Sequence, residues 1–304
     1  MKQPNLFIVG APKCGTSSVA RWMALHPDIF VPSVKEPHYY CAESIRCQYP
    51  NKDEYLSLYS PGVEHLYRLD ASVRYLYSDV AVTNILKDCP EAKFVVCLRN
   101  PVDMAFSLHS EHLNKSGRED VSSFSEAWSL SDDRMLGRRL PILARGDRFL
   151  AYKDSCRIGS QANLLLERVP ASQVHVVILD DFMRRPQETS GRLLQFLQLP
   201  EGPNPSFPHA NPAQSLKYPG LKRALKHCFV MKSRLGVKRG MPKIGALARQ
   251  LESRIDKFNS TTRKEQMDEA TRRVVTAYFL DEIHKIWDLA GVRYPDWVEC
   301  LDQA

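Results

Sequence analysis

The sequence predicts an α/β fold, a single domain with a central parallel sheet flanked by helices. Three short apolar runs lead to this prediction, at residues 5–10, 93–98 and 174–179. Each run is followed by a stretch in which apolar residues recur with helical spacing. Near-continuous apolar strands that alternate with helices are typical of a parallel sheet buried on both faces.

The first unit reads strand, loop, helix. The strand at 5–10 stops at Gly10, a loop continues to Gly15, and a helix is expected over about 16–26. Three successive hydroxyl residues open this helix, a position where side chains that accept backbone hydrogen bonds are favoured.

The two later units repeat this order. The strand at 93–98 is followed by a helical pattern that extends to about residue 114. The strand at 174–179 meets two aspartates and is followed by an amphipathic helix through about residue 198. Strand and helix thus alternate throughout the predicted fold.

Three further helices are expected outside these units. Weaker helical patterns lie at 79–88 and 155–169, and a longer amphipathic pattern spans about 268–290. Gly291 follows the last of them, where a glycine suits the C-terminal cap of a helix.

Composition excludes several classes of protein. The chain has 304 residues, 43% hydrophobic and 25% charged, as in ordinary soluble globular proteins. No run approaches the 18 or so apolar residues of a membrane span. The N-terminus reaches Gly, Pro and Lys too early for a secretory signal, so a cytoplasmic location is expected. The eight cysteines form no C-x-x-C pair, which favours reduced thiols over disulfides and predicts no metal site.

The net charge of +7 is concentrated in one segment. Residues 202–251 contain ten Lys and Arg and no Asp or Glu, whereas the remainder carries 32 basic against 35 acidic residues. Six prolines make 200–220 irregular. We therefore expect one domain over 1–304 with a basic lid or insertion at about 202–251. It either meets an anionic ligand or is a solvated basic face.

Residues 10–17, Gly-Ala-Pro-Lys-Cys-Gly-Thr-Ser, resemble a P-loop, because they follow a buried strand and open a helix. Backbone N–H groups and the helix dipole would hold phosphate oxygens there, so the fold is P-loop-like. A nucleotide hydrolase needs a lysine where this sequence has Thr16, and the loop's lysine is Lys13 instead. A standard hydrolase is therefore disfavoured, and an ordinary strand-to-helix turn is the alternative.

Two motifs together resemble those of sulfotransferases that use 3′-phosphoadenosine 5′-phosphosulfate (PAPS). FIVGAPKCGTSSV at 7–19 resembles the family's 5′-phosphosulfate loop. Arg99-Asn-Pro-Val-Asp-Met-Ala-Phe-Ser107 resembles the motif in which an Arg and a downstream Ser hold the 3′-phosphate. Arg99 ends a strand, at the ligand crevice of a parallel sheet, and Ser107 lies about two helical turns further on. An ordinary surface Arg and a helix Ser are the alternative.

The resemblance extends along the chain. LHPDIFVPSVKEPHYY at 25–40 resembles the segment after the loop helix in heparan-type and bacterial sulfotransferases. The stretches 70–75, 157–159 and 289–297 resemble further family segments.

Three departures from the family pattern are present. Val73 replaces a proline, and Met104 or Ala105 stands where an arginine is common. Some relatives have a histidine at the position of Glu111, which here has His109 and His112 on either side. These departures leave open whether a histidine of this helix takes part in catalysis.

The resemblance implies a transfer of the sulfuryl group from PAPS to a hydroxyl acceptor, releasing 3′-phosphoadenosine 5′-phosphate (PAP). Glu36 would be the general base, and Lys13 would stabilise the leaving phosphate. His38 could orient Glu36, bind the acceptor or simply pack, and an exposed loop carboxylate is the alternative for Glu36.

The implied donor-binding residues come from the loop, the second motif and the C-terminal segment that closes over the donor in the family. They are Lys13, Cys14, Gly15, Thr16, Ser17, Ser18, Arg99, Ser107, Lys217 and Tyr218, with Lys222 as a further candidate.

The acceptor would be a glycan or a small-molecule alcohol. The remaining basic residues of 202–251 would attract an anionic acceptor or lie on an amphipathic lid in peripheral contact with a membrane. Nucleic acid is disfavoured, because aromatic residues are not interleaved with the charges. A P-loop kinase and a non-catalytic nucleotide- or glycan-binding module are the alternative functions.

Overall fold

The computed structural model describes most of the chain, namely residues 3–41, 49, 51–144, 148–205, 215–216, 260–261 and 266–302. Most of the predicted basic lid at about 202–251 lies outside these residues, as do Lys217, Tyr218 and Lys222. None of the described helices is long and apolar enough to cross a membrane.

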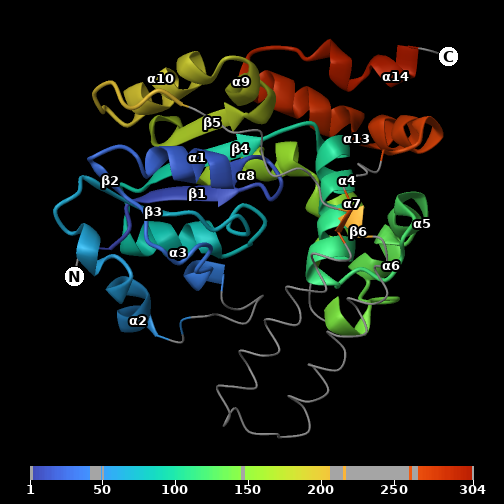
Figure 1. Ribbon diagram of the computed structural model, residues 1–304, viewed down its shortest axis with the longest axis horizontal. Coiled ribbons are helices and arrows are strands. Elements are labelled where there is room, and N and C mark those ends of the chain that lie inside the picture. The colour runs from blue at the N-terminus through green and yellow to red at the C-terminus, as the bar shows by residue number, and fades with distance from the viewer. Residues whose placement is uncertain are drawn as a thin grey trace, which may run out of the picture. The chain divides into compact units, whose positions relative to one another are not determined.

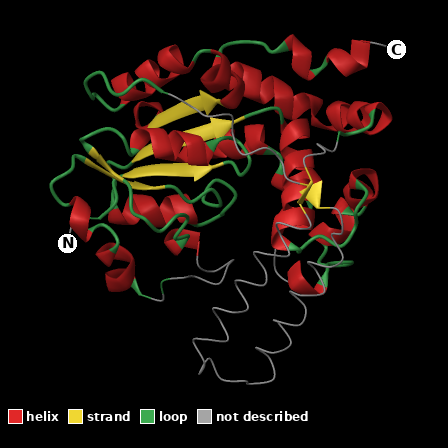
Figure 2. Ribbon diagram, viewed as in Figure 1, coloured by secondary structure: helices red, strands yellow, loops and turns green. Residues whose placement is uncertain are grey.

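A five-stranded parallel sheet forms the centre of the fold within the described residues (Figure 2). Its strand order is β2-β3-β1-β4-β5, and every neighbouring pair is parallel. The strands are β1 (Leu6–Gly10), β2 (Ile29–Phe30), β3 (Tyr67–Asp70), β4 (Lys93–Leu98) and β5 (Val174–Ile178). The predicted fold class is thereby confirmed.

Helices cover the two faces of this sheet (Figure 1). The helices α3 (Ala81–Asp88) and α8 (Ile158–Arg168) contact each other and precede β4 and β5, respectively. The helix α1 (Thr16–Met23) follows β1 and leads toward the other edge of the sheet. The crossover from β1 to β2 runs toward one edge of the sheet, whereas those from β3 to β4 and from β4 to β5 run toward the other. Right-handed crossovers in opposite directions put their helices on opposite faces.

The chain divides into two compact units, which we describe separately. Unit 1 comprises 1–104, 155–210 and 272–304 and contains the sheet. Unit 2 comprises 105–154 and 211–271. The organisation as a single domain stays a prediction.

Among the remaining elements of the described residues, three helices are longer than the others. The longer ones are α4 (Pro101–Glu111), α10 (Pro186–Phe196) and α13 (Glu269–Ala290). The short helices are α2 (Lys52–Ser57), α5 (Phe124–Ser129), α6 (Ser131–Met135), α7 (Tyr152–Ser155), α9 (Leu179–Arg184) and α14 (Glu299–Asp302). The strands β6 (Ser215–Leu216) and β7 (Ser260–Thr261) form an antiparallel pair.

The predicted helices differ from the observed ones mainly at their ends. The single helix expected up to residue 198 is two helices, α9 and α10, because Pro186 has no N–H group to continue the first helix. The α-helix expected up to residue 114 ends at Glu111, and a π-helical turn follows over His112–Ser116. Gly291 has a positive φ of 66°, as expected of a C-terminal cap.

Two strands of the central sheet have no counterpart in the sequence prediction. The strand β2 has only two residues, and β3 reads Tyr-Arg-Leu-Asp, which is not an apolar run. Arg68 and Asp70 of β3 are nevertheless buried. The described cysteines are free thiols, and the reduced state stays a prediction.

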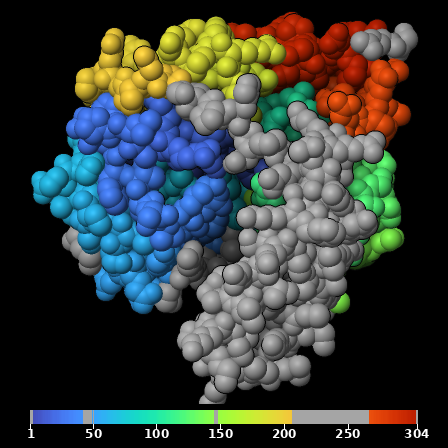
Figure 3. Space-filling view, viewed as in Figure 1, coloured from blue at the N-terminus to red at the C-terminus, as the bar shows by residue number. Residues whose placement is uncertain are grey.

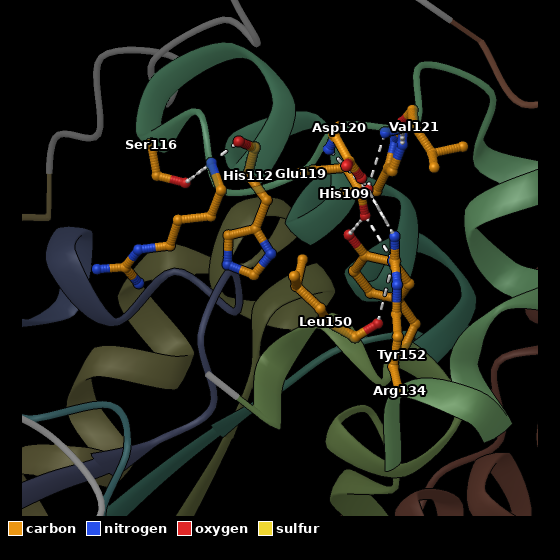
Figure 4. A network of polar contacts seen from close by, with 10 residues as sticks. His109, His112, Ser116, Glu119, Asp120, Val121, Arg134, Leu150 and Tyr152 are labelled. Carbon is orange, nitrogen blue, oxygen red and sulfur yellow. Dashed lines mark hydrogen bonds and ion pairs between the residues drawn. The ribbon is translucent and has the colours of Figure 1, made fainter. Parts of the chain in front are cut away.

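Unit 2 is organised around a buried ion pair (Figure 4). The Arg134 guanidinium donates two 2.7 Å hydrogen bonds to the Glu119 carboxylate, which also accepts from the Tyr152 hydroxyl at 2.8 Å. Burial raises the pKa of Glu119, but the hydrogen bonds and charge of Arg134 outweigh it and hold that pKa below its ordinary value. This network joins three separate segments of unit 2.

Two histidines of the predicted 101–114 helix belong to the interior of unit 2 (Figure 4). His109 Nε2 lies 2.9 Å from the Val121 carbonyl oxygen, and its ring packs on Phe124 and Tyr152. His112 is buried beside Tyr152 as well. These contacts favour a structural role for both histidines.

In unit 1, α8 and α13 approach closely at Gly159. The Glu282 carboxylate accepts hydrogen bonds from the Ser160 amide, at 2.7 Å, and from the Ser160 hydroxyl. A carboxylate at the start of a helix is stabilised by the helix dipole. A Cβ atom on Gly159 would lie 2.7 Å from the Glu282 carbonyl oxygen, so this crossing requires a glycine.

We expect Gly159→Ala to destabilise the protein by about 1–3 kcal/mol, because the added methyl group overpacks the crossing. Urea unfolding measures this change. Gly191→Ala is the matched control, since Gly191 is exposed in α10 and its Cβ would meet nothing within 4 Å. The control should be neutral or stabilising by up to about 1 kcal/mol. Equal effects of the two variants would contradict the close approach.

Candidate functional site

The candidate site lies at the carboxyl edge of the sheet in unit 1. The strand β1 is central, with β3 on one side and β4 on the other. In open α/β sheets, ligands bind outside the carboxyl ends of the strands, where the strand order reverses. The loops after β1 and β4 are therefore the expected ligand-binding loops.

The loop after β1 has the backbone of an anion-binding turn. Lys13 and Gly15 have positive φ values of 65° and 81°, and Gly15 is the N-cap of α1. The first N–H groups of a helix have no partner within the helix and are available to an anion. A Cβ on Gly15 would lie 2.6 Å from Leu179 Cδ1, so the end of that side chain would have to shift, and the positive φ itself favours glycine.

The side chains of this loop differ in what they could offer a ligand. Cys14 is buried, and its Sγ lies 3.5 Å from the Pro12 carbonyl oxygen and 4.0 Å from Met104 Sδ. Burial raises the pKa of Cys14 to about 12, so the group remains a thiol. The Cys14 backbone N–H donates within the loop, to the Ala11 carbonyl oxygen at 3.3 Å. Thr16 is buried, whereas Ser17 and Ser18 are half-buried.

Arg99, directly after β4, contacts the loop after β1, which we call the phosphate loop (residues 10–17). Its Nη1 donates a 3.1 Å hydrogen bond to the Lys13 carbonyl oxygen. Its Nη2 lies 3.7 Å from the Asp103 carboxylate, which also accepts from Arg272 Nη2 at 3.0 Å. Two of the sequence motifs thus meet in space, and Arg272 adds a cation that the sequence did not reveal.

A third strand end contributes Asp180, which follows β5. Burial raises the pKa of Asp180 above its ordinary value, although the charge of Arg99 opposes this shift. In the space-filling view, the N-terminal part of unit 1, in blue, lies next to the region of α9 and α10, in yellow (Figure 3).

Residues 36–41, the strap, carry the candidate base. Glu36 and His38 both have positive φ values, 56° and 52°. Non-glycine residues rarely adopt this conformation, and such strain gathers at functional sites. His38 Nε2 lies 3.3 Å from Glu36 Oε2, and Lys35 Nζ lies 2.9 Å from Glu36 Oε1. Of the three roles left open for His38, this contact favours orientation of Glu36.

The surroundings of Glu36 keep it ionised. Burial alone would raise the pKa of Glu36, but the hydrogen bonds and charges of His38 and Lys35 lower it from 4.5 to about 2. The carboxylate is therefore unprotonated at neutral pH and can accept a proton.

The structure does not bring every predicted residue to this edge. Ser107 is half-buried on α4 in unit 2, so its position relative to Arg99 is not described. Lys217 and Tyr218 lie outside the described residues. Sequence reasoning missed Arg272, which lies 169 residues from its partner Asp103, so no local pattern could have indicated this contact.

The known proteins that this chain resembles are sulfotransferases. A model of the sulfotransferase family matches residues 4–203. Mouse carbohydrate sulfotransferase 15 is 24% identical over 246 residues, which cover 64% of this chain and 44% of that protein. Human heparan sulfate glucosamine 3-O-sulfotransferase 6 is 29% identical over 113 residues, covering 37% of this chain and 32% of that protein. This chain therefore spans less than half the length of these curated relatives.

A solved structure has the same fold over nearly its whole length. It is a sulfotransferase from Alicyclobacillus acidocaldarius, which aligns with a TM-score of 0.67 and 23% identity. The alignment covers 98% of this chain and 99% of that chain.

We expect His38→Ala to raise the pKa of Glu36 from about 2 toward 4.5, because the carboxylate loses a hydrogen bond and a nearby charge. Carbon-detected NMR titration of the Glu36 carboxyl group measures this shift. His284→Ala is the control, since His284 is exposed on α13. An unchanged Glu36 pKa in His38→Ala would show that His38 does not stabilise the charged form.

Proposed function

Because the chain belongs to the sulfotransferase family, we propose that it transfers a sulfuryl group from PAPS to a hydroxyl acceptor. The single observation that carries this proposal is the 3.1 Å hydrogen bond from Arg99 to the Lys13 carbonyl oxygen. It joins the two loops that would bind the two phosphate ends of the donor.

At the donor end, the phosphate loop offers backbone N–H groups at the start of α1 and the Lys13 side chain. We propose that Lys13 stabilises the negative charge that develops on the leaving phosphate. Arg99 would hold the 3′-phosphate, because a guanidinium matches the geometry of phosphate oxygens. Roles for Ser107, Lys217 and Tyr218 stay predictions.

At the acceptor end, we propose Glu36 as the general base. During transfer, the acceptor oxygen forms a bond to sulfur while the bond from sulfur to the phosphate oxygen breaks, in line. The acceptor hydroxyl proton passes to the Glu36 carboxylate, and the bridging electron pair leaves with PAP. The contact with His38 supports this role, because it holds one carboxylate oxygen in place.

For the acceptor, we propose a class by analogy with the names of the relatives. Names such as carbohydrate sulfotransferase and heparan sulfate glucosamine 3-O-sulfotransferase support a glycan acceptor, which can be anionic. A small-molecule alcohol is the alternative. A cytoplasmic location stays a prediction.

We expect PAP to bind at least about tenfold more tightly than ADP, because a charge-assisted hydrogen bond to the 3′-phosphate contributes about 1.5–3 kcal/mol. Isothermal titration calorimetry measures both affinities. Arg99→Ala should remove most of the preference, whereas Arg192→Ala, on the exposed surface of α10, should keep it. Equal affinities of the wild-type protein for PAP and ADP would rule out a PAPS site and favour a kinase.

We expect Glu36→Gln to lower transfer by about 10²–10⁴-fold, because glutamine cannot take the acceptor proton. Transfer is measured with ³⁵S-labelled PAPS on desulfated heparan sulfate and on a neutral alkyl glycoside. PAP affinity should stay unchanged in this variant. Glu64→Gln, at an exposed glutamate, is the control. Undiminished transfer by Glu36→Gln would eliminate Glu36 as the base.

A further inference from the structure

Asp70 is a buried carboxylate beneath the strap, and the proposed mechanism does not use it. It ends β3, pairs in register with Phe7 of β1 and has no exposed surface. A buried carboxylate is costly unless hydrogen bonds compensate for the lost water. Burial raises the pKa of Asp70, while bonds from nearby hydroxyl groups oppose the shift.

Three hydroxyl groups donate to Asp70. Ser72 Oγ donates to Oδ1 at 2.6 Å, whereas the Tyr55 and Tyr75 hydroxyls donate to Oδ2 at 2.7 and 2.9 Å. All three residues are buried. The carboxylate therefore determines the direction in which each hydroxyl proton points.

Two of these hydroxyls also contact the backbone of the strap. The His38 amide donates to Ser72 Oγ at 3.0 Å, and the Tyr40 amide donates to the Tyr75 hydroxyl at 3.4 Å. A hydroxyl group has one proton and two lone pairs. Since the hydroxyl protons of Ser72 and Tyr75 are donated to Asp70, these two hydroxyls can bond to the strap only as acceptors. This arrangement suits the two strap amides.

The strap needs such support because its backbone is strained. Glu36 and His38 both have positive φ values, and such conformations persist only where the surroundings determine them. The amide of His38 donates to Ser72, and the ring of the same residue contacts Glu36. A change in the position of the His38 backbone would therefore move the ring away from the carboxylate.

We propose that Asp70 is a positioning residue which, through Ser72 and Tyr75, holds the strap so that His38 meets Glu36. This inference rests on the proposed role of Glu36 as the base. The relay runs from the end of β3 to the strap backbone, and Asp70 itself does not touch the reacting groups.

Tyr55 provides a matched control for this relay. Its hydroxyl donates to the same carboxylate oxygen as that of Tyr75, and its ring stacks on Tyr39 at a centroid distance of 4.3 Å. Tyr55→Phe removes one bond to Asp70 and keeps this ring contact. Ser72→Ala also removes one bond to Asp70, but it removes the acceptor of the His38 amide as well.

The experiment compares Ser72→Ala, Asp70→Asn and Tyr55→Phe in the full chain. In Ser72→Ala and Asp70→Asn, kcat for ³⁵S transfer to desulfated heparan sulfate and the alkyl glycoside should fall on the order of 10–100-fold, because the base is misplaced. KM for PAPS and the affinity for PAP should stay within about twofold, since the phosphate loop is untouched. Tyr55→Phe should keep the wild-type kcat, although its urea midpoint should fall about as much as that of Ser72→Ala.

Crystal structures of the same variants supply a readout that does not depend on the acceptor. The separation of His38 Nε2 from Glu36 Oε2, 3.3 Å in the wild-type protein, should increase in Ser72→Ala and stay the same in Tyr55→Phe. An unchanged separation in Ser72→Ala would overturn the proposal, and so would an equal loss of kcat in Ser72→Ala and Tyr55→Phe. If the wild-type protein transfers sulfate to neither acceptor, the proposed function fails for these acceptors, whereas the crystal structures still decide whether Asp70 positions the strap.

Discussion

Parallel pairing of β1 with both β3 and β4 is the constraint on which the candidate site depends. Because parallel strands end at the same edge, three chain segments that are distant in sequence meet there. They are the phosphate loop after β1, Asp70 at the end of β3 and Arg99 after β4. The bond from Arg99 to the Lys13 carbonyl oxygen is a direct consequence of this arrangement.

Three of the five described non-glycine residues with positive φ are candidate site residues. Lys13, Glu36 and His38 are non-glycine residues with positive φ, at a cost of about 1–3 kcal/mol each. The fold offsets this cost through the bond from Arg99 to Lys13 and the bond from the His38 amide to Ser72. Side chains that could contact the donor and the acceptor are thus held in place before either ligand binds, which favours catalysis by orientation.

Three carboxylates illustrate different ways of compensating for lost hydration. Glu119 has a fully buried arginine partner, and this ion pair joins segments of unit 2. Asp70 has three hydroxyl donors, and two of them, Ser72 and Tyr75, also accept hydrogen bonds from strap amides. Glu36 is less enclosed, and His38 and Lys35 keep it charged. Each carboxylate is therefore stabilised by different partners, which compensate for the water that it loses.

The sequence by itself determined the features that local pattern encodes. Apolar runs predicted β1, β4 and β5, and the order of glycines, lysine and hydroxyl residues predicted the phosphate loop. Only the tertiary structure revealed β3, because the charged residues Arg68 and Asp70 interrupt the apolar pattern expected of a buried strand. It also revealed the contacts of Asp103 with Arg272 and of Ser72 with His38. The physical reason is that strand and loop preferences act between neighbours in the chain. Hydrogen bonds between distant segments depend instead on how the sheet brings those segments together.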